Sequence, residues 1–305
     1  MDDSLTAGKP FRSGFVAVVG RTNVGKSTLT NALVGSKVSI VSPRPQTTRT
    51  TIRGVSHRPD AQIVFLDTPG MHRPRSLLGE RTNASAVTAI GEVDVVLWVV
   101  GAAESVGPGD RHVADQIRGH RTPVVVAVTK TDRATPAQIA ERLTECSKEI
   151  DAVAFCPVSG LEGDGLDALR SELEGLLAEG PEYFPLGMVS DQPESSLIAE
   201  MVREQLLLRT HDEIPHSIAV TVTELEERTT RAGEELLAAS VTIYVERDSQ
   251  KGIVLGRGGA LMKDAATAAR LQLEGLLGVR MHLDVRVKVE RDWQRRAGML
   301  DRLGF

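Results

Sequence analysis

The chain has 305 residues, of which 41% are hydrophobic and 25% charged, and its formal net charge is −5. This length and composition predict a soluble globular protein with two domains. The acidic balance argues against a protein that coats DNA or binds membranes through a polybasic segment. The polar N-terminus lacks a signal-peptide core, and the longest apolar run, residues 93–103, is too short to span a bilayer. Cys146 and Cys156 fit no metal-binding spacing, which favours a reduced, cytoplasmic chain.

The first half of the chain shows the pattern of an α/β fold. After a flexible tail expected at residues 1–12, short runs rich in Val and Ile alternate with longer helix-compatible segments over residues 13–180. This alternation predicts a mostly parallel sheet with helices on both faces. Two extended runs meet at Arg58–Asp60, where we expect a hairpin and an antiparallel edge strand.

The stretch GRTNVGKS at residues 20–27 matches the phosphate-loop pattern G-x-x-x-x-G-K-S/T, between a predicted strand and a predicted helix. The glycines let backbone N–H groups surround phosphate oxygens, and the helix N-terminus adds positive potential. Lys26 would reach the β- and γ-phosphates, and Ser27 would hold Mg²⁺. The predicted nucleotide-binding residues of this loop are Gly20, Arg21, Thr22, Asn23, Val24, Gly25, Lys26, Ser27 and Thr28.

A second motif, DTPG at residues 67–70, ends the strand AQIVFLD. Its carboxylate can hold the Mg²⁺ shell, and the N–H of Gly70 can reach the γ-phosphate. Met71 stands where Ras-like GTPases carry a water-orienting glutamine, so we expect slow hydrolysis that relies on backbone groups, Mg²⁺ and Lys26. The predicted nucleotide contacts here are Asp67, Thr68, Pro69, Gly70 and Met71.

Residues 45–49, PQTTR, lie between these two motifs. A threonine in this segment normally closes over Mg²⁺ when the γ-phosphate is present, and such ordering makes a switch. Thr48 is the first candidate and Thr47 the alternative, with an ordinary polar loop as the competing interpretation. The predicted catalytic residues are Lys26, Thr48, Gly70 and Asn23, and the predicted Mg²⁺ ligands are Ser27, Thr48 and Asp67.

The motif TKTD at residues 129–132 predicts selection of guanine. Asp132 can accept hydrogen bonds from guanine N1 and the exocyclic amine, a pair that adenine does not offer, and the stem of Lys130 can cover the base. Thr129 replaces the asparagine of the usual NKxD motif, which lowers the expected affinity slightly. Further on, the backbone N–H groups of Val158, Ser159 and Gly160 could reach guanine O6.

A break rich in Pro and Gly at residues 181–193 predicts a linker. Residues 194–305 then predict an α+β domain in the order helix, strand (216–226), strand, short helix, loop, helix, strand. Charge is segregated within it, because residues 191–235 carry a net charge of −7 and residues 247–305 a net charge of +5. The positive part contains a second glycine-rich loop.

This second loop, GRGG at residues 256–259, lacks the Gly-Lys-Ser ending and joins two predicted helices. A GxxG loop between helices, in this order of elements, is typical of a type II KH domain, where the loop clamps a single-stranded nucleic-acid backbone. Glycine lets the backbone approach the phosphates, and basic side chains supply charge. The predicted RNA-binding residues are Gly256, Arg257, Gly258, Gly259 and Lys263.

Nearly the whole chain resembles the bacterial Era family of GTPases. The resemblance rests on GRTNVGKS, PQTTR, DTPGM, TKTD, VSG, SDQPE, EIPHSIAV, IVLGRGG and the ending VRMHLDVRVKVERDWQRRAGMLDRLGF, while the extended N-terminus and Thr129 depart from it. It implies GTP and GDP as ligands, binding of 16S rRNA near its 3′ end, a role in maturation of the 30S subunit, and a monomer. It also implies a cytoplasmic protein with a fraction peripherally bound to the inner face of the cell membrane.

GTPases with a GxxNxGKS loop and a hydrophobic residue in place of the glutamine often bind potassium near the phosphates, so the resemblance adds K⁺ stimulation, with Asn23 as the helper. Two other classes of function compete with a ribosome-assembly GTPase. A signalling or membrane-associated switch would act through protein partners, and the KH-like loop argues against it as the main role. An ATP-dependent kinase or transferase is disfavoured by TKTD.

Overall fold

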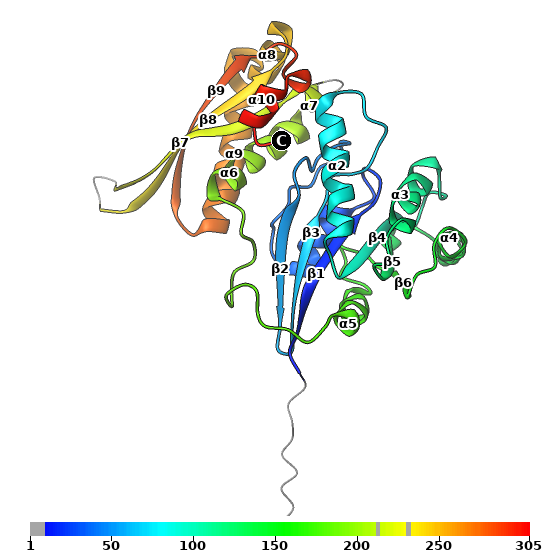
Figure 1. Ribbon diagram of the computed structural model, residues 1–305. Coiled ribbons are helices and arrows are strands. Elements are labelled where there is room, and N and C mark those ends of the chain that lie inside the picture. The colour runs from blue at the N-terminus through cyan, green and yellow to red at the C-terminus, as the bar shows by residue number, and fades with distance from the viewer. Residues whose placement is uncertain (1–9, 212–213, 230–232) are drawn as a thin grey trace, which may run out of the picture. The chain divides into compact units, whose positions relative to one another are not determined.

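The computed structural model describes residues 10–211, 214–229 and 233–305 (Figure 1). The chain forms two compact units. The first contains the residues up to 38 together with 51–71 and 86–191, and the second contains 39–50, 72–85 and 192–305. Two short segments of the predicted nucleotide-binding half therefore belong to the second unit by their packing.

The first unit is built on a six-stranded sheet in the order β2-β3-β1-β4-β5-β6. Neighbouring strands pair in parallel except β2, which pairs with β3 in antiparallel register at the edge. The predicted hairpin at residues 58–60 is thereby confirmed. The strands are β1 Arg12–Val19, β2 Ile52–Arg58, β3 Ala61–Asp67, β4 Val95–Gly101, β5 Val124–Thr129 and β6 Ala154–Pro157.

Hydrophobic cores lie on both faces of this sheet, because strands such as β4 are buried along their whole length. Leucines of α1 and α5 belong to one core, and side chains of α2, α3 and α4 belong to the other. The helices are α1 Lys26–Val34, α2 Leu77–Gly91, α3 Pro108–Arg118, α4 Pro136–Glu149 and α5 Leu166–Leu176, with a 3₁₀ turn η1 at Thr131–Arg133.

Most of the predicted linker packs against the first unit. The Val55 N–H of β2 donates to Val189 O at 2.8 Å, and Gln62 of β3 bonds the backbone of Tyr183 and Phe184. An edge strand presents backbone groups without a strand partner, and this segment satisfies some of them. The first unit ends at Asp191.

The second unit contains a three-stranded sheet in the order β7-β8-β9, with β7 antiparallel and β9 parallel to β8. One hydrophobic core includes apolar residues of α6, α9 and all three strands, and another contains Leu78, Ala219, Tyr244, Trp293, Met299 and Leu300. The elements are α6 Glu194–Arg209, α7 Ile214–Ser217, β7 Ala219–Thr229, β8 Glu235–Val245, α8 Asp248–Leu255, η2 Arg257–Gly259, α9 Ala260–Leu277, β9 Arg280–Val289, η3 Trp293–Arg295 and α10 Ala297–Arg302.

The expected strand at residues 216–226 begins too early. Residues Ile214–Ser217 form the short helix α7, and the strand starts at Ala219. Pro215 explains the difference, since its fixed φ and missing N–H suit the first turn of a helix. Among the described residues, no helix is both long and apolar enough to cross a bilayer.

Candidate nucleotide site and nucleic-acid interface

The phosphate loop connects β1 to α1, as the sequence predicts. Gly25 is the residue before α1 and has φ 100°, a left-handed conformation that favours glycine. Asn23 also has a positive φ, 62°. These conformations turn the loop ahead of the helix N-terminus, where backbone N–H groups can bind an anion.

Lys26 is 6% exposed, and its Nζ donates to Arg21 O at 2.9 Å and to Gly20 O at 3.2 Å. Burial lowers the pKa of Lys26 to about 8, while the carboxylate of Asp67 acts in the opposite direction. Burial therefore disfavours the protonated form of Lys26, and a phosphate bound beside the ammonium would raise the pKa again.

Asp67 ends β3 and is fully buried, and Ser27 is the second residue of α1. A serine hydroxyl and a carboxylate are oxygen donors of the kind that Mg²⁺ prefers. The strand end is joined to the phosphate loop, since the Met71 N–H donates to Gly20 O at 3.2 Å. The Met71 side chain packs in the core beside the sheet. It therefore takes no part in orienting water.

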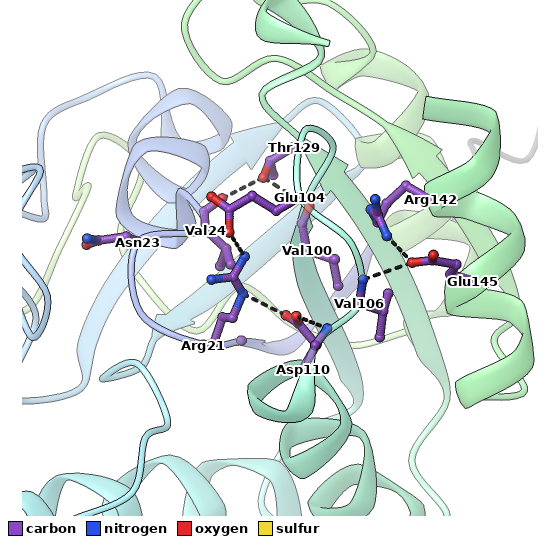
Figure 2. A network of polar contacts seen from close by, with 12 residues as sticks. Arg21, Asn23, Val24, Val100, Glu104, Val106, Asp110, Thr129, Arg142 and Glu145 are labelled. Carbon is purple, nitrogen blue, oxygen red and sulfur yellow. Dashed lines mark hydrogen bonds and ion pairs between the residues drawn. The ribbon is translucent and has the colours of Figure 1, made fainter. Parts of the chain in front are cut away.

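Two residues of the guanine motif also donate hydrogen bonds to backbone carbonyls of the phosphate loop. Thr129 Oγ1 lies 2.5 Å from Val24 O and 3.2 Å from Val100 O, and its hydrogen can be donated to either carbonyl (Figure 2). Lys130 Nζ donates to Asn23 O at 2.5 Å. Thr129 thus provides a donor to the loop, even though it lacks the second polar group of an asparagine.

The predicted guanine contacts of Val158 and Ser159 need correction. Their N–H groups donate to Val128 O at 2.8 Å and to Asp164 O at 2.9 Å, so neither points at a base. The contact of the Gly160 N–H with guanine O6 stays a prediction. Ser159 acts through its side chain instead, because its Oγ donates to Asp132 Oδ1 at 2.7 Å and orients the carboxylate. Sequence reasoning missed this role, for which only the spacing between the two motifs gave a signal.

The predicted switch segment, residues 45–49, lies within the stretch 39–50 that packs in the second unit. Thr48 is 6% exposed, and Thr47 O accepts a hydrogen bond from Arg203 of α6. Arg49 is buried, and its guanidinium donates to Ile218 O at 2.5 Å, to His216 O at 3.1 Å and to Pro215 O at 3.2 Å. The sequence gives no sign of these contacts.

The GRGG loop lies between α8 and α9. Gly256, Gly258 and Gly259 have φ of 72°, 58° and 80°, which a side chain would strain. A Cβ added at Gly258 or Gly259 would meet no atom within 4 Å, so this stretch of backbone is open to a ligand. Arg257 is exposed at its centre.

A groove of about 300 Å³ lies along α9 and β9. Lys263, predicted from its place after the glycine loop, is part of its wall, and the groove adds two polar residues that sequence reasoning missed, Arg270 and His282. The remaining lining residues are Met262, Ala266, Thr267, Leu283 and Val285. Apolar walls with a few cationic or polar groups suit a nucleic-acid base and its backbone.

Comparison with known proteins gives the family. Residues 15–130 match the family described as 50S ribosome-binding GTPase, and residues 213–294 match the KH domain family. GTPase Era of Mycobacterium sp. (strain JLS) is 51% identical over 97% of this chain and 99% of its own length, and that of Mycolicibacterium smegmatis is 49% identical over the same shares. The chain belongs to the Era family of GTPases.

Two solved Era structures are similar over 96% of this chain and 99% of their own. One is Era in complex with MgGDPNP and nucleotides 1506–1542 of 16S ribosomal RNA, with a TM-score of 0.92 and 37% identity. The other is an Aquifex aeolicus Era variant bound to GDP and AlF₄⁻, with a TM-score of 0.91 and 36% identity. The expected fold, a P-loop GTPase domain followed by a type II KH domain, is confirmed for this Era-family chain, and so is its activity as a GTPase.

Proposed function

We propose that this chain binds GTP with Mg²⁺, hydrolyses it slowly to GDP and phosphate, and binds 16S rRNA near its 3′ end in maturation of the 30S subunit. The observation that carries the proposal is the similarity over 96% of the chain, at a TM-score of 0.92, to an Era structure that contains MgGDPNP and this part of the RNA. RNA binding is also supported by this chain's own residues, because Lys263 and Arg270 line a groove that follows the GRGG loop.

At the nucleotide, the residues act mainly through charge and position. Lys26, whose Nζ is directed by the carbonyls of Gly20 and Arg21, places its ammonium against the β- and γ-phosphates. Ser27 and Asp67 are the groups of this unit that fit Mg²⁺, which neutralises phosphate charge when bound. Asp132, held by Ser159, accepts the two hydrogen bonds that distinguish guanine from adenine.

At the RNA, the open backbone of GRGG lies against phosphates, while Arg257 and Lys263 supply positive charge. The groove takes an unstacked base against its apolar walls. Arg270 and His282 lie where they can bond the polar edge of that base.

The test is fluorescence-anisotropy titration of a labelled RNA with the 16S 3′-terminal sequence, in the presence of a non-hydrolysable GTP analogue or GDP. Gly258→Asp places a negative charge on the open loop and should abolish binding. Gly275→Asp is the matched control, since this position on α9 is also open and lies 17 residues from Gly258. Tight binding that depends on the nucleotide and is lost only in Gly258→Asp supports the proposal. No binding in any state contradicts it and favours a switch that acts through protein partners.

Potassium stimulation of hydrolysis is part of the proposed reaction, with Asn23 as the helper residue. Its support is the phosphate loop with Asn23 at a positive φ of 62° and the buried Met71 in place of a water-orienting glutamine. Turnover measured in potassium and in sodium buffers of equal ionic strength should differ for the wild type and be equal for Asn23→Ala. Equal turnover of the wild type in both buffers would refute it.

In this proposal the protein acts in the cytoplasm, where 16S rRNA is assembled into subunits. A fraction of the protein is bound peripherally to the inner face of the cell membrane. The membrane fraction is proposed from the family resemblance alone. The protein acts as a monomer. Cell fractionation and size-exclusion chromatography with light scattering test these statements, and a purely soluble pool or a stable dimer would contradict them.

A further inference from the structure

The side chain of Arg21 lies outside the phosphate cradle, between two acidic residues. Its Nε donates to Asp110 Oδ1 at 3.1 Å, and its Nη2 pairs with Glu104 (Figure 2). The stem passes over the start of α3, where a Cβ added at Gly109 would lie 3.6 Å from Arg21 Cδ. Figure 2 also shows the side chain of Asn23 turned away from this group.

The Asp110 carboxylate is itself held in place, whereas the Glu104 side chain is 65% exposed on a loop whose backbone is anchored. Asp110 is 1% exposed, and its Oδ2 accepts a hydrogen bond from the N–H of Gly107 at 3.0 Å, which caps α3. Glu104 lies in the loop between β4 and α3, where the Val106 N–H donates to Glu145 of α4 at 2.8 Å. The guanidinium is therefore bonded to a fixed loop and a helix start, and a buried carboxylate such as Asp110 is costly unless it is paired.

The backbone of Arg21 meets two groups that act on the phosphates. Its carbonyl accepts the hydrogen bond from Lys26 Nζ at 2.9 Å. Its main chain also forms a parallel β-bridge with Met71, the residue directly after Gly70, whose N–H is predicted to bind the γ-phosphate. Arg21 thus contacts Lys26, Met71 at the end of the DTPG turn and Asp110 at the start of α3.

We propose that Arg21 is a positioning residue for GTP hydrolysis, whose guanidinium, held by Asp110 and Glu104, fixes the turn of the phosphate loop that places Lys26 and Gly70. The guanidinium is bonded to Asp110 and Glu104. Its contribution reaches the reaction through the backbone, because transition-state stabilisation depends on donors that are already in position.

The test compares Arg21→Gln with Arg111→Gln in steady-state GTP hydrolysis, GDP affinity and thermal unfolding. Arg111 is a matched control, since it lies next to Asp110 on α3 and pairs with Glu149 at the end of α4. We expect Arg21→Gln to lower kcat by about tenfold to a hundredfold, the range for loss of charged hydrogen bonds. GDP affinity should change less, because GDP has no γ-phosphate. Arg111→Gln should leave both unchanged, and Arg21→Lys, which keeps the charge, should restore part of the rate.

Asp110→Asn separates positioning from direct contact. If the carboxylate holds Arg21 for positioning, this variant lowers kcat, and the double variant with Arg21→Gln is no slower than Arg21→Gln alone. If Arg21 instead swings onto the phosphates as a cis-acting arginine, loosening it raises kcat, and the proposal is overturned. It is also overturned if kcat of Arg21→Gln stays within about twofold of wild type, or if kcat, GDP affinity and melting temperature fall in parallel, as loss of structure alone would produce.

Discussion

The guanidinium carbon of Arg49 lies 5.8 Å from the centre of the Trp293 ring, within the second unit. Arg49 belongs to the PQTTR segment, and Trp293 follows the last strand of the KH domain. Trp293 is fully buried, and its indole N–H donates to Ser217 O at 2.9 Å, directly beside the carbonyls that bind Arg49. The end of the predicted switch is therefore bonded into the RNA-binding unit.

This contact predicts that Arg49→Lys uncouples RNA binding from the nucleotide. A lysine cannot bond three carbonyls with the geometry of a guanidinium. A nucleotide-dependent change in residues 45–49 would then no longer be transmitted through Arg49 to the KH unit. The ratio of RNA affinities with the GTP analogue and with GDP should fall towards 1 from the ~5- to 150-fold typical of coupled sites. Arg53→Gln is the control, because Arg53 is exposed and pairs with Asp191 of the first unit. An unchanged ratio in Arg49→Lys would show that the nucleotide affects RNA binding through contacts other than those of Arg49.

The lowered pKa of Lys26 predicts proton uptake when GDP binds. Burial holds this pKa at about 8, and a bound phosphate raises it, so binding takes up a proton wherever the pH lies between the two values. At pH 8.5 we expect an uptake of about three quarters of a proton, and at pH 7 only about a tenth. GDP affinity accordingly weakens as pH rises above about 8.

Isothermal titration calorimetry in buffers of different ionisation enthalpy measures this uptake. Lys26→Arg should lose it, because arginine stays protonated over this range. Lys130→Arg tests the other lysine of the site, whose pKa is also lowered by burial. If proton uptake persists in Lys26→Arg and disappears in Lys130→Arg, the proton binds to Lys130, and our assignment to Lys26 is wrong.

Thr129→Val tests whether the threonine of TKTD supports the phosphate loop. Valine keeps the shape and the branching but leaves the carbonyl of Val24 without the donor that lies 2.5 Å away. GDP affinity should fall by about 1 kcal/mol, roughly fivefold, as expected for one buried hydrogen bond. Thr144→Val is the control, since Thr144 also donates to a backbone carbonyl, that of Ala140, on the exposed side of α4. Equal affinity of Thr129→Val and wild type would mean that this bond is dispensable.

The sequence by itself determined the local chemistry of the protein. The phosphate loop and the GRGG loop follow from short-range rules, because glycine at fixed spacing permits backbone conformations that other residues avoid. The parallel sheet follows from apolar runs buried on both faces, and the guanine motif from the hydrogen-bonding groups of Asp132. All of these depend on residues that are neighbours in the chain or recur at a regular period.

Only the tertiary structure decided which distant residues meet. Arg21 and Asp110 are 89 residues apart, and Arg49 and Ile218 are 169 apart, and no periodicity or motif links either pair. Ser159 and Asp132 belong to two motifs predicted to bind the same base, but the hydrogen bond between them appears only in the structure, as does the groove that Arg270 and His282 both line. Buried charges and carbonyls must find partners, but which partners they find depends on how whole helices and strands pack, and that is a property of the entire chain.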